Sequence, residues 1–107
     1  MRILIAEDDR ISRSFLQKFM QSYGEVDMAV DGMEAVDLYM DSIKQNNRYD
    51  LLCLDIMMPK VDGLKVLKVI RQLEKNKTLR NALKNDAAHE DLKNALKSLL
   101  AELEDAD

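Results

Sequence analysis

The spacing of apolar residues predicts three strands and three helices in alternation over the first 75 positions. Continuous apolar runs at 3–6 and 51–54 are typical of buried strands, and the alternating residues 26–30 predict a half-exposed strand at a sheet edge. This order predicts an α/β fold with a parallel sheet and right-handed crossovers, in which the two fully apolar strands are central. Apolar residues three and four apart predict helices over roughly 12–23, 35–43 and 63–75.

The sequence changes character at about Asn76. From there to residue 107 the only apolar residues are Leu and Ala, and there is no Ile, Val, Met, aromatic residue, Cys, Gly or Pro. If one straight helix ran from Gly63 to residue 83, its apolar residues at 79–83 would lie on the side opposite to Val66 and Ile70. This favours a helix break near Asn76, with Thr78 as N-cap, and one continuous helix is the alternative. Residues 79–85 are echoed at 92–98, which predicts a helical hairpin.

Length and composition restrict the class of protein. The 107 residues suffice for one compact domain with a small core. No apolar run is long enough to span a membrane, and the run at the N-terminus is too short for a signal peptide. A single cysteine excludes an intramolecular disulfide, so we expect a reducing, cytoplasmic setting. The net charge of −4 argues against a nucleic-acid partner.

The charge is also unevenly distributed along the chain. Residues 60–84 carry eight basic residues and two acids, whereas residues 85–107 carry two lysines and seven acids. The two segments are either a complementary pair of helices or two separately solvated faces, and both interpretations stay open because exposed ion pairs stabilise little. The lone His89 is expected on the solvated surface, because no second metal ligand lies near it in the sequence.

Acidic residues follow two of the predicted strands. Glu7 and Asp8 come directly after the first apolar run, and Asp55 follows the run at 51–54. Ligands of open parallel sheets bind at the carboxyl ends of the strands, so neighbouring strands would bring these three carboxylates together. An all-oxygen set of this kind favours Mg²⁺. The alternative is that Asp8 or Asp9 only caps the first helix and that Asp55 is solvated.

Three motifs resemble the receiver domain of bacterial two-component response regulators. They are the run Ile3-Leu4-Ile5-Ala6-Glu7-Asp8-Asp9, the pair Asp31-Gly32 with Glu34-Ala35, and the stretch from Tyr49 to Gly63 that contains Asp55-Ile56-Met57-Met58-Pro59. The resemblance covers about residues 1–75 and implies half of a flavodoxin-like doubly wound fold, with strand order 2-1-3. Residues 76–107 would then be a helical segment that packs on the same core as one structural domain.

The resemblance also implies roles for individual residues. Asp55 would be the phosphoacceptor, and a histidine kinase would be its partner. Mg²⁺ would be held by Asp8, Asp55 and the backbone carbonyl of Met57, with Glu7 acting through water. The chain itself would not be an enzyme.

The sequence departs from the family after Gly63. The family continues with two strands, one ending in a Ser or Thr that binds the phosphoryl group and the next ending in a Lys. Here no later segment has a strand pattern: Thr78 lies in a polar helical context, and Lys84, Lys93 and Lys97 follow no apolar run. We therefore expect weak Mg²⁺ binding, slow phosphotransfer and no switch.

Three functions fit these features. The low-diversity tail on a receiver-like half favours an engineered chimera or truncated receiver with a mainly structural purpose and a vestigial site. A natural receiver that accepts phosphate on Asp55 is the second, and a helical dimerisation or interaction module is the third. We expect the tail to cover the first-helix face of the half-sheet. A homodimer through the open sheet edge or through the tail is the alternative.

Overall fold

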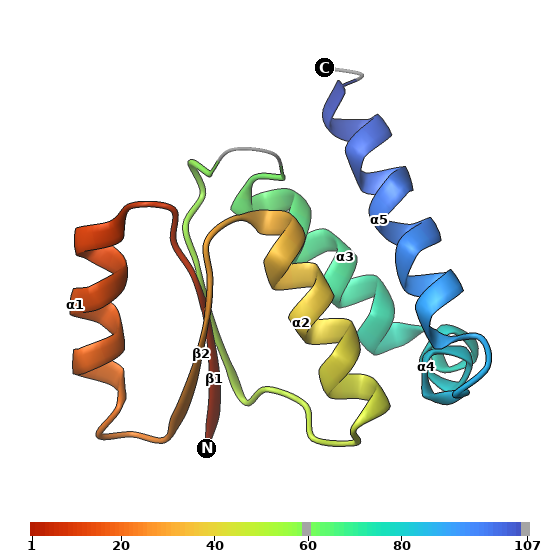
Figure 1. Ribbon diagram of the computed structural model, residues 1–107, viewed down its shortest axis with the longest axis horizontal. Coiled ribbons are helices and arrows are strands. Elements are labelled where there is room, and N and C mark those ends of the chain that lie inside the picture. Colours follow the sequence, from red (N-terminus) through yellow and green to blue (C-terminus); the bar gives the residue numbers. More distant parts are fainter. Residues whose placement is uncertain (59–60, 106–107) are drawn as a thin grey trace.

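The computed structural model describes residues 1–58 and 61–105. Strands and helices alternate over the first half of this part of the chain, and helices alone follow (Figure 1). In the described residues no helix is both long and apolar enough to cross a membrane. The elements are β1 (Arg2–Ala6), α1 (Arg10–Met20), β2 (Glu25–Ala29), α2 (Gly32–Lys44), β3 (Leu51–Leu54), α3 (Gly63–Lys75), α4 (Lys77–Lys84) and α5 (His89–Asp105).

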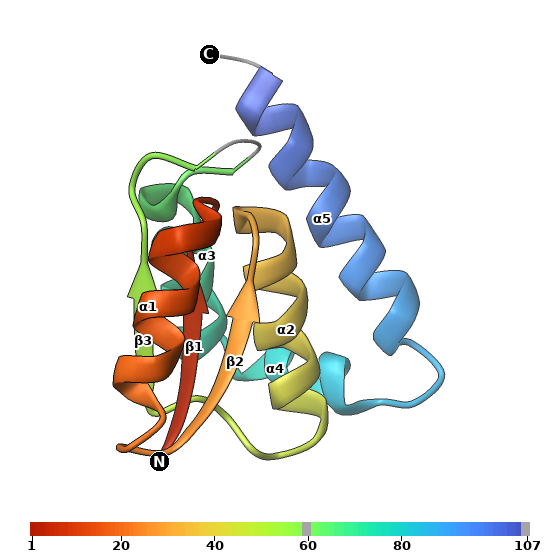
Figure 2. The same ribbon diagram turned by 60° about the vertical axis from the view of Figure 1, so that its left-hand side comes forward.

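The three strands form a parallel sheet in the order β2-β1-β3 (Figure 2). Ile3 of β1 lies opposite Val26 on one side and Leu51 on the other. The predicted α/β class and the 2-1-3 order are confirmed. Only β1 is central, however, and the second fully apolar strand, β3, lies at an edge with one side unpaired in the described structure.

The sheet is covered unequally on its two faces. Figure 1 shows α1 alone on one face, and α2 and α3 together on the other. The main core lies between the sheet and the α2–α3 layer, where Leu4, Val36 and Ile70 are fully buried. No residue of α1 is buried to the same degree.

The helix break at Asn76 is confirmed. Asn76 is extended, with φ −99° and ψ 95°, and its side chain accepts a hydrogen bond of 3.0 Å from the backbone N–H of Leu79. Asn76 is therefore the N-cap of α4, and the prediction of Thr78 for this role is wrong. Asn85 stabilises the next turn, since its side chain accepts bonds from the N–H groups of Ala87 and Ala88.

The position predicted for the tail is wrong. Helices α4 and α5 form a hairpin, but it packs on the outer side of α2 and α3 and not on the α1 face (Figure 1). Leu83 and Leu100 join the same buried cluster as Leu4. The one-residue break at Asn76 keeps α4 beside the end of α3, so the short hairpin stays next to the helix layer and away from α1.

Polar contacts fix α5 to α2. His89 is only 3% exposed: its Nδ1 lies 2.6 Å from the carbonyl oxygen of Leu83, and its Nε2 lies 3.1 Å from Asp41 Oδ1. The predicted surface position of His89 is therefore wrong. Lys93 Nζ also contacts Asp41 Oδ1, at 2.9 Å, and Lys97 Nζ lies 3.0 Å from Asp37 Oδ1. These pairs join the lysines of α5 to the acids of α2.

These contacts lower the pKa of the Asp41 carboxyl. Partial burial by itself would raise the pKa of the Asp41 carboxyl, but hydrogen bonds from Lys93 and His89 outweigh that effect and hold the pKa below its usual value. The docking of α5 thus favours the charged form of the Asp41 carboxyl.

We expect a core substitution in the tail to destabilise the whole fold. Leu83→Ala should lower the free energy of unfolding by about 2–5 kcal/mol, because Leu83 is fully buried against α2 and α3. The matched control Leu99→Ala removes the same atoms from an exposed side chain and should change it by about 0.5 kcal/mol or less. Urea unfolding followed by circular dichroism measures both. Equal, small effects would mean that the tail is not part of the core.

Candidate functional site

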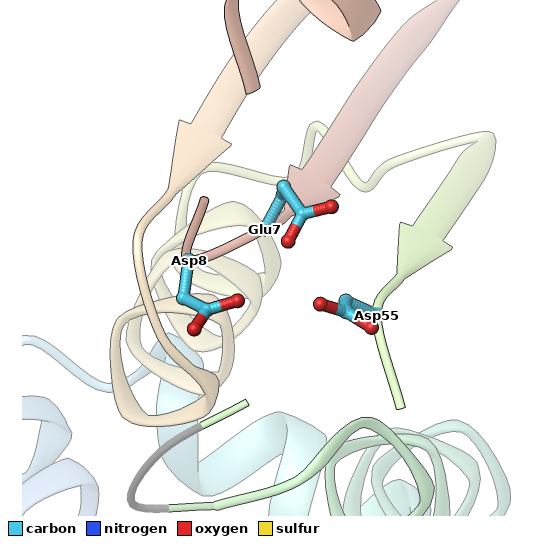
Figure 3. A group of neighbouring side chains, drawn as sticks. All are labelled: Glu7, Asp8 and Asp55. Atoms are coloured by element: carbon cyan, nitrogen blue, oxygen red, sulfur yellow. The ribbon is translucent and has the colours of Figure 1, made fainter. Parts of the chain in front are cut away.

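Three carboxylates meet at the carboxyl edge of the sheet. Glu7 and Asp8 follow β1, and Asp55 follows β3 (Figure 3). Each offers an oxygen atom that lies within 4.8 Å of the other two. The structure thus brings together the three acids that the sequence predicts to converge. Asp9 lies apart from them, since its side chain caps α1 by accepting a hydrogen bond of 2.8 Å from the N–H of Ser12.

Backbone hydrogen bonds position Asp55. Its N–H extends the sheet by donating to the carbonyl oxygen of Ala6 at 3.0 Å, and its Oδ1 accepts from the N–H of Met57 at 3.1 Å. The N–H of Gly63 then donates to the carbonyl oxygen of Ile56 at 3.3 Å, which ties the start of α3 to the turn after Asp55. A side chain at Gly63 would collide with the backbone carbonyl of Asp55, so only glycine allows this approach.

Arg13 holds the backbone of Glu7 and Asp8 in place. Its Nη1 donates to the backbone carbonyl oxygens of Glu7 and Asp8, at 3.1 and 3.2 Å. Arg13 therefore holds the segment that carries two of the three acids and places a positive charge beside them. Sequence reasoning missed this residue. The available signal was a basic side chain one helical turn after three consecutive acids.

The surroundings shift the pKa values of Glu7 and Asp55 in opposite directions. Burial, with the neighbouring Asp55 as a further cause, raises the pKa of Glu7. The backbone N–H of Met57 is the main cause that lowers the pKa of Asp55. The surroundings therefore make Asp55 the stronger acid of the pair and Glu7 the weaker one.

The donor set fits a hard divalent cation. All three side chains offer oxygen, and Asp8 is exposed, so bound water can complete the coordination that Mg²⁺ requires. A cation would also relieve the repulsion among three neighbouring acids. The Met57 carbonyl as a further ligand remains a prediction, and Pro59 and Lys60 of the motif lie outside the described residues.

The described residues contain no later strand that could end in the hydroxyl or the lysine that the resemblance implies. Within residues 1–58 and 61–105 no strand follows Leu54. Thr78 lies in the first turn of α4, and Lys84 is the last residue of that helix. Lys93 and Lys97 lie on α5 and contact the acids of α2.

An open groove leads from the acids along the α1 side of β3. Its volume is about 180 Å³. Asp55 and Glu7 lie at one end of it, and Leu16 of α1 and Cys53 of β3 line its walls. Helix α1 packs mainly on β1 and β2, which leaves this groove open between Leu16 and β3.

The comparisons with known proteins identify the family. The sequence model of the response regulator receiver domain matches residues 3–105, which extends beyond the 75 residues of the resemblance noted in the sequence. The chain therefore belongs to the response regulator receiver domain family. It is 43% identical to the response regulator MprA of Mycobacterium sp. (strain KMS) over 72 residues, which are 66% of this chain and 29% of MprA. It is 44% identical to the transcriptional regulatory protein CpxR of Escherichia coli (strain K12), also over 72 residues and covering 28% of CpxR. The chain thus spans less than a third of these curated relatives.

Solved structures share this fold over about seven tenths of the chain. The receiver domain of the histidine kinase CKI1 from Arabidopsis thaliana, complexed with Mg²⁺ and BeF₃⁻, aligns with a TM-score of 0.65 and 28% identity, covering 69% of this chain and 56% of that one. The complex of CheX and CheY with BeF₃⁻ and Mg²⁺ from Borrelia burgdorferi aligns with a TM-score of 0.62 and 36% identity, covering 71% and 56%. The complex of the histidine kinase ThkA with the response regulator TrrA aligns with a TM-score of 0.59 and 37% identity, covering 70% and 61%.

We expect Glu7 and Asp55 to titrate in separate pH ranges. Without Mg²⁺, Glu7 should have a midpoint above 4.5 and Asp55 a midpoint below 3.8, which are their ordinary values. In Asp55→Asn the midpoint of Glu7 should fall only part of the way, since its burial remains while the neighbouring charge is gone. Side-chain carboxyl chemical shifts measured against pH give the midpoints. A lower midpoint for Glu7 than for Asp55 would contradict this arrangement.

Proposed function

We propose that this chain is a Mg²⁺-dependent phosphoacceptor that takes a phosphoryl group on Asp55. The supporting observation is the meeting of Glu7, Asp8 and Asp55 at one sheet edge, with the pKa of Asp55 held low. Membership of the receiver family supports the same reaction. Two of the similar structures contain Mg²⁺ together with BeF₃⁻.

In the proposed reaction an oxygen of Asp55 attacks the phosphorus of a phosphohistidine. A bond forms between that oxygen and phosphorus, and the bond from phosphorus to the imidazole nitrogen breaks. Asp8, Asp55 and the Met57 carbonyl would hold Mg²⁺, and Glu7 would act through water. When bound, Mg²⁺ supplies positive charge that offsets the charge of the transferring group. Arg13 keeps Glu7 and Asp8 in place through their backbone carbonyls.

A histidine kinase is the proposed partner, and the cytoplasm is the proposed location. The similarity to a structure in which the histidine kinase ThkA is in complex with the response regulator TrrA supports that partner. The chain would act as a substrate of the kinase and would not itself be an enzyme. Since no strand-end Thr or Lys lies beside Asp55 in the described residues, transfer should be slow and the usual switch absent.

Residues 76–107, the helical tail, allow more than one hypothesis about their origin and role. An engineered chimera with a mainly structural purpose fits its Leu- and Ala-only apolar residues, but the family match through residue 105 speaks against it. We propose that residues 76–107 complete one structural domain, because Leu83 and Leu100 belong to the common core. A helical interaction module is the alternative role for the tail, and a homodimer through the sheet edge or the tail is a further hypothesis.

Phosphorylation should depend on Asp55. With Mg²⁺ and acetyl phosphate we expect intact-protein mass spectrometry to detect one added phosphoryl group, which Asp55→Asn should abolish. Asp50→Asn is the matched control, because Asp50 lies at the opposite end of β3 and accepts a hydrogen bond from the N–H of Arg2 that Asn can also accept. Equal labelling of all three proteins would place the phosphate elsewhere, and no labelling would reject the proposed function.

Magnesium binding should depend on Asp8. A Mg²⁺ titration followed by amide chemical shifts should move Asp8 and Asp55 at millimolar ion, and Asp8→Asn should weaken binding by about tenfold or more, because it removes one of three converging charges. Asp9→Asn is the control: Asn can still cap α1, and Asp9 is not one of the converging acids. Unchanged shifts in the wild-type protein would exclude the metal site.

A further inference from the structure

An exposed row of large apolar side chains runs along α1 and the turn after it. Ile11, Phe15, Phe19 and Tyr23, here called the aromatic ridge, are 80%, 67%, 58% and 59% exposed. The rings are regularly spaced, with centroids 6.4 Å apart from Phe15 to Phe19 and 6.1 Å apart from Phe19 to Tyr23. The residues recur every four positions, so they share one side of the helix.

The fold does not account for the aromatic ridge. Leu16 and Met20 are half-buried on another side of α1, and the tail lies on the far side of the molecule (Figure 1). The three rings alone expose on the order of 350 Å² at about 200 Å² for each side chain, and Ile11 adds to this area. This is the size of the largest apolar patch on a typical monomer, about 300–600 Å², and such a patch is often a binding surface.

We propose that the aromatic ridge binds a second copy of this chain, with the two α1 helices antiparallel across a two-fold axis. The four-residue spacing makes the ridge complementary to itself. An antiparallel copy sets Phe15 against the partner's Phe19, and Ile11 against the partner's Tyr23. Such a contact is isologous and closes at two subunits.

The exposed area suits a small dimer of this kind. A standard interface buries about 800 Å² per partner, of which somewhat more than half is apolar. The apolar area exposed by the aromatic ridge, together with the α1 side of β3, is close to the apolar area of such an interface. The groove between α1 and β3 would be covered by the same contact, because Leu16 lines both this groove and the adjoining hollow that Ile11 and Phe15 line.

Two other surfaces of the chain suit self-association less well. The free edge of β3 is flanked by Asp50 and Asp55, and antiparallel pairing of two β3 strands would place Asp50 opposite the partner's Asp55. Like charges directly opposite each other destabilise such a pair. Much of the apolar stripe of the tail packs against the core through Leu83, Leu92 and Leu96, and the part that stays open, around Leu99, faces a hollow beside α3.

Sedimentation equilibrium tests the dimer. Without Mg²⁺ or phosphodonor, the mean mass of the wild-type protein should rise toward twice that of one chain between micromolar and millimolar concentration. Phe19→Ser should weaken association by about tenfold or more, since truncating a central interface side chain has effects of this size. The control Leu64→Ser changes an apolar side chain of similar exposure on α3 and should leave association unchanged.

Alkylation of Cys53 gives a second readout. It is the only cysteine of the chain, and it lies in the groove that the second copy would cover. Its reaction rate should fall severalfold as wild-type concentration rises, and Phe19→Ser, with its fold checked by circular dichroism, should lose this protection. A strict monomer, association that Phe19→Ser leaves intact, or open-ended growth beyond two chains would each overturn the proposal. Protection of Cys53 by a histidine kinase alone would assign the surface to that partner. Because phosphate and metal are absent, these results do not depend on the proposed phosphoacceptor function.

Discussion

Burial of β1 on both faces and along both edges is the constraint on which the other elements depend. Ile3, Leu4 and Ile5 have no exposed surface. Successive side chains of a strand point to opposite faces, so β1 needs a cover on each side. The helix α1 supplies one, and α2 with α3 supplies the other (Figure 1). Glu7 and Asp8 directly follow β1, and Asp55 directly follows β3. The position of β1 therefore places Glu7 and Asp8 at the carboxyl ends of the strands, beside Asp55.

The two sides of the sheet differ in thickness, and the tail increases that difference. Helices α4 and α5 add a further layer where α2 and α3 already cover the sheet, and ion pairs to Asp37 and Asp41 fix α5 there. The α1 side has a single helix. The acids lie at the boundary between the two sides, so one wall of the site is rigidly packed by α3 and the other is an open groove along β3.

Local patterns in the sequence predicted most of the fold and the three acids. The strands, the first three helices and the break at Asn76 follow from residue spacing, which is set within a few positions. Contacts between distant residues could not be predicted in this way. A stripe of leucines does not specify which surface it packs against, so the pattern of the tail favoured the wrong face of the sheet. The burial of His89 depends on Asp41, which is 48 residues away. Arg13 acts through backbone carbonyls, so its position one helical turn after three acids was the only sign of its role in the sequence.

The close approach of Gly63 to Asp55 has a consequence for how this sequence can diverge. Alanine is the smallest possible replacement, yet its methyl group would already collide with the carbonyl of Asp55 and push α3 away from the turn. A mutation at Gly63 would thus disturb the acids although it alters none of them. The exposed positions of α3, such as Leu64, meet no such barrier and are free to drift. The arrangement of the three carboxylates therefore depends on a position that has no side chain.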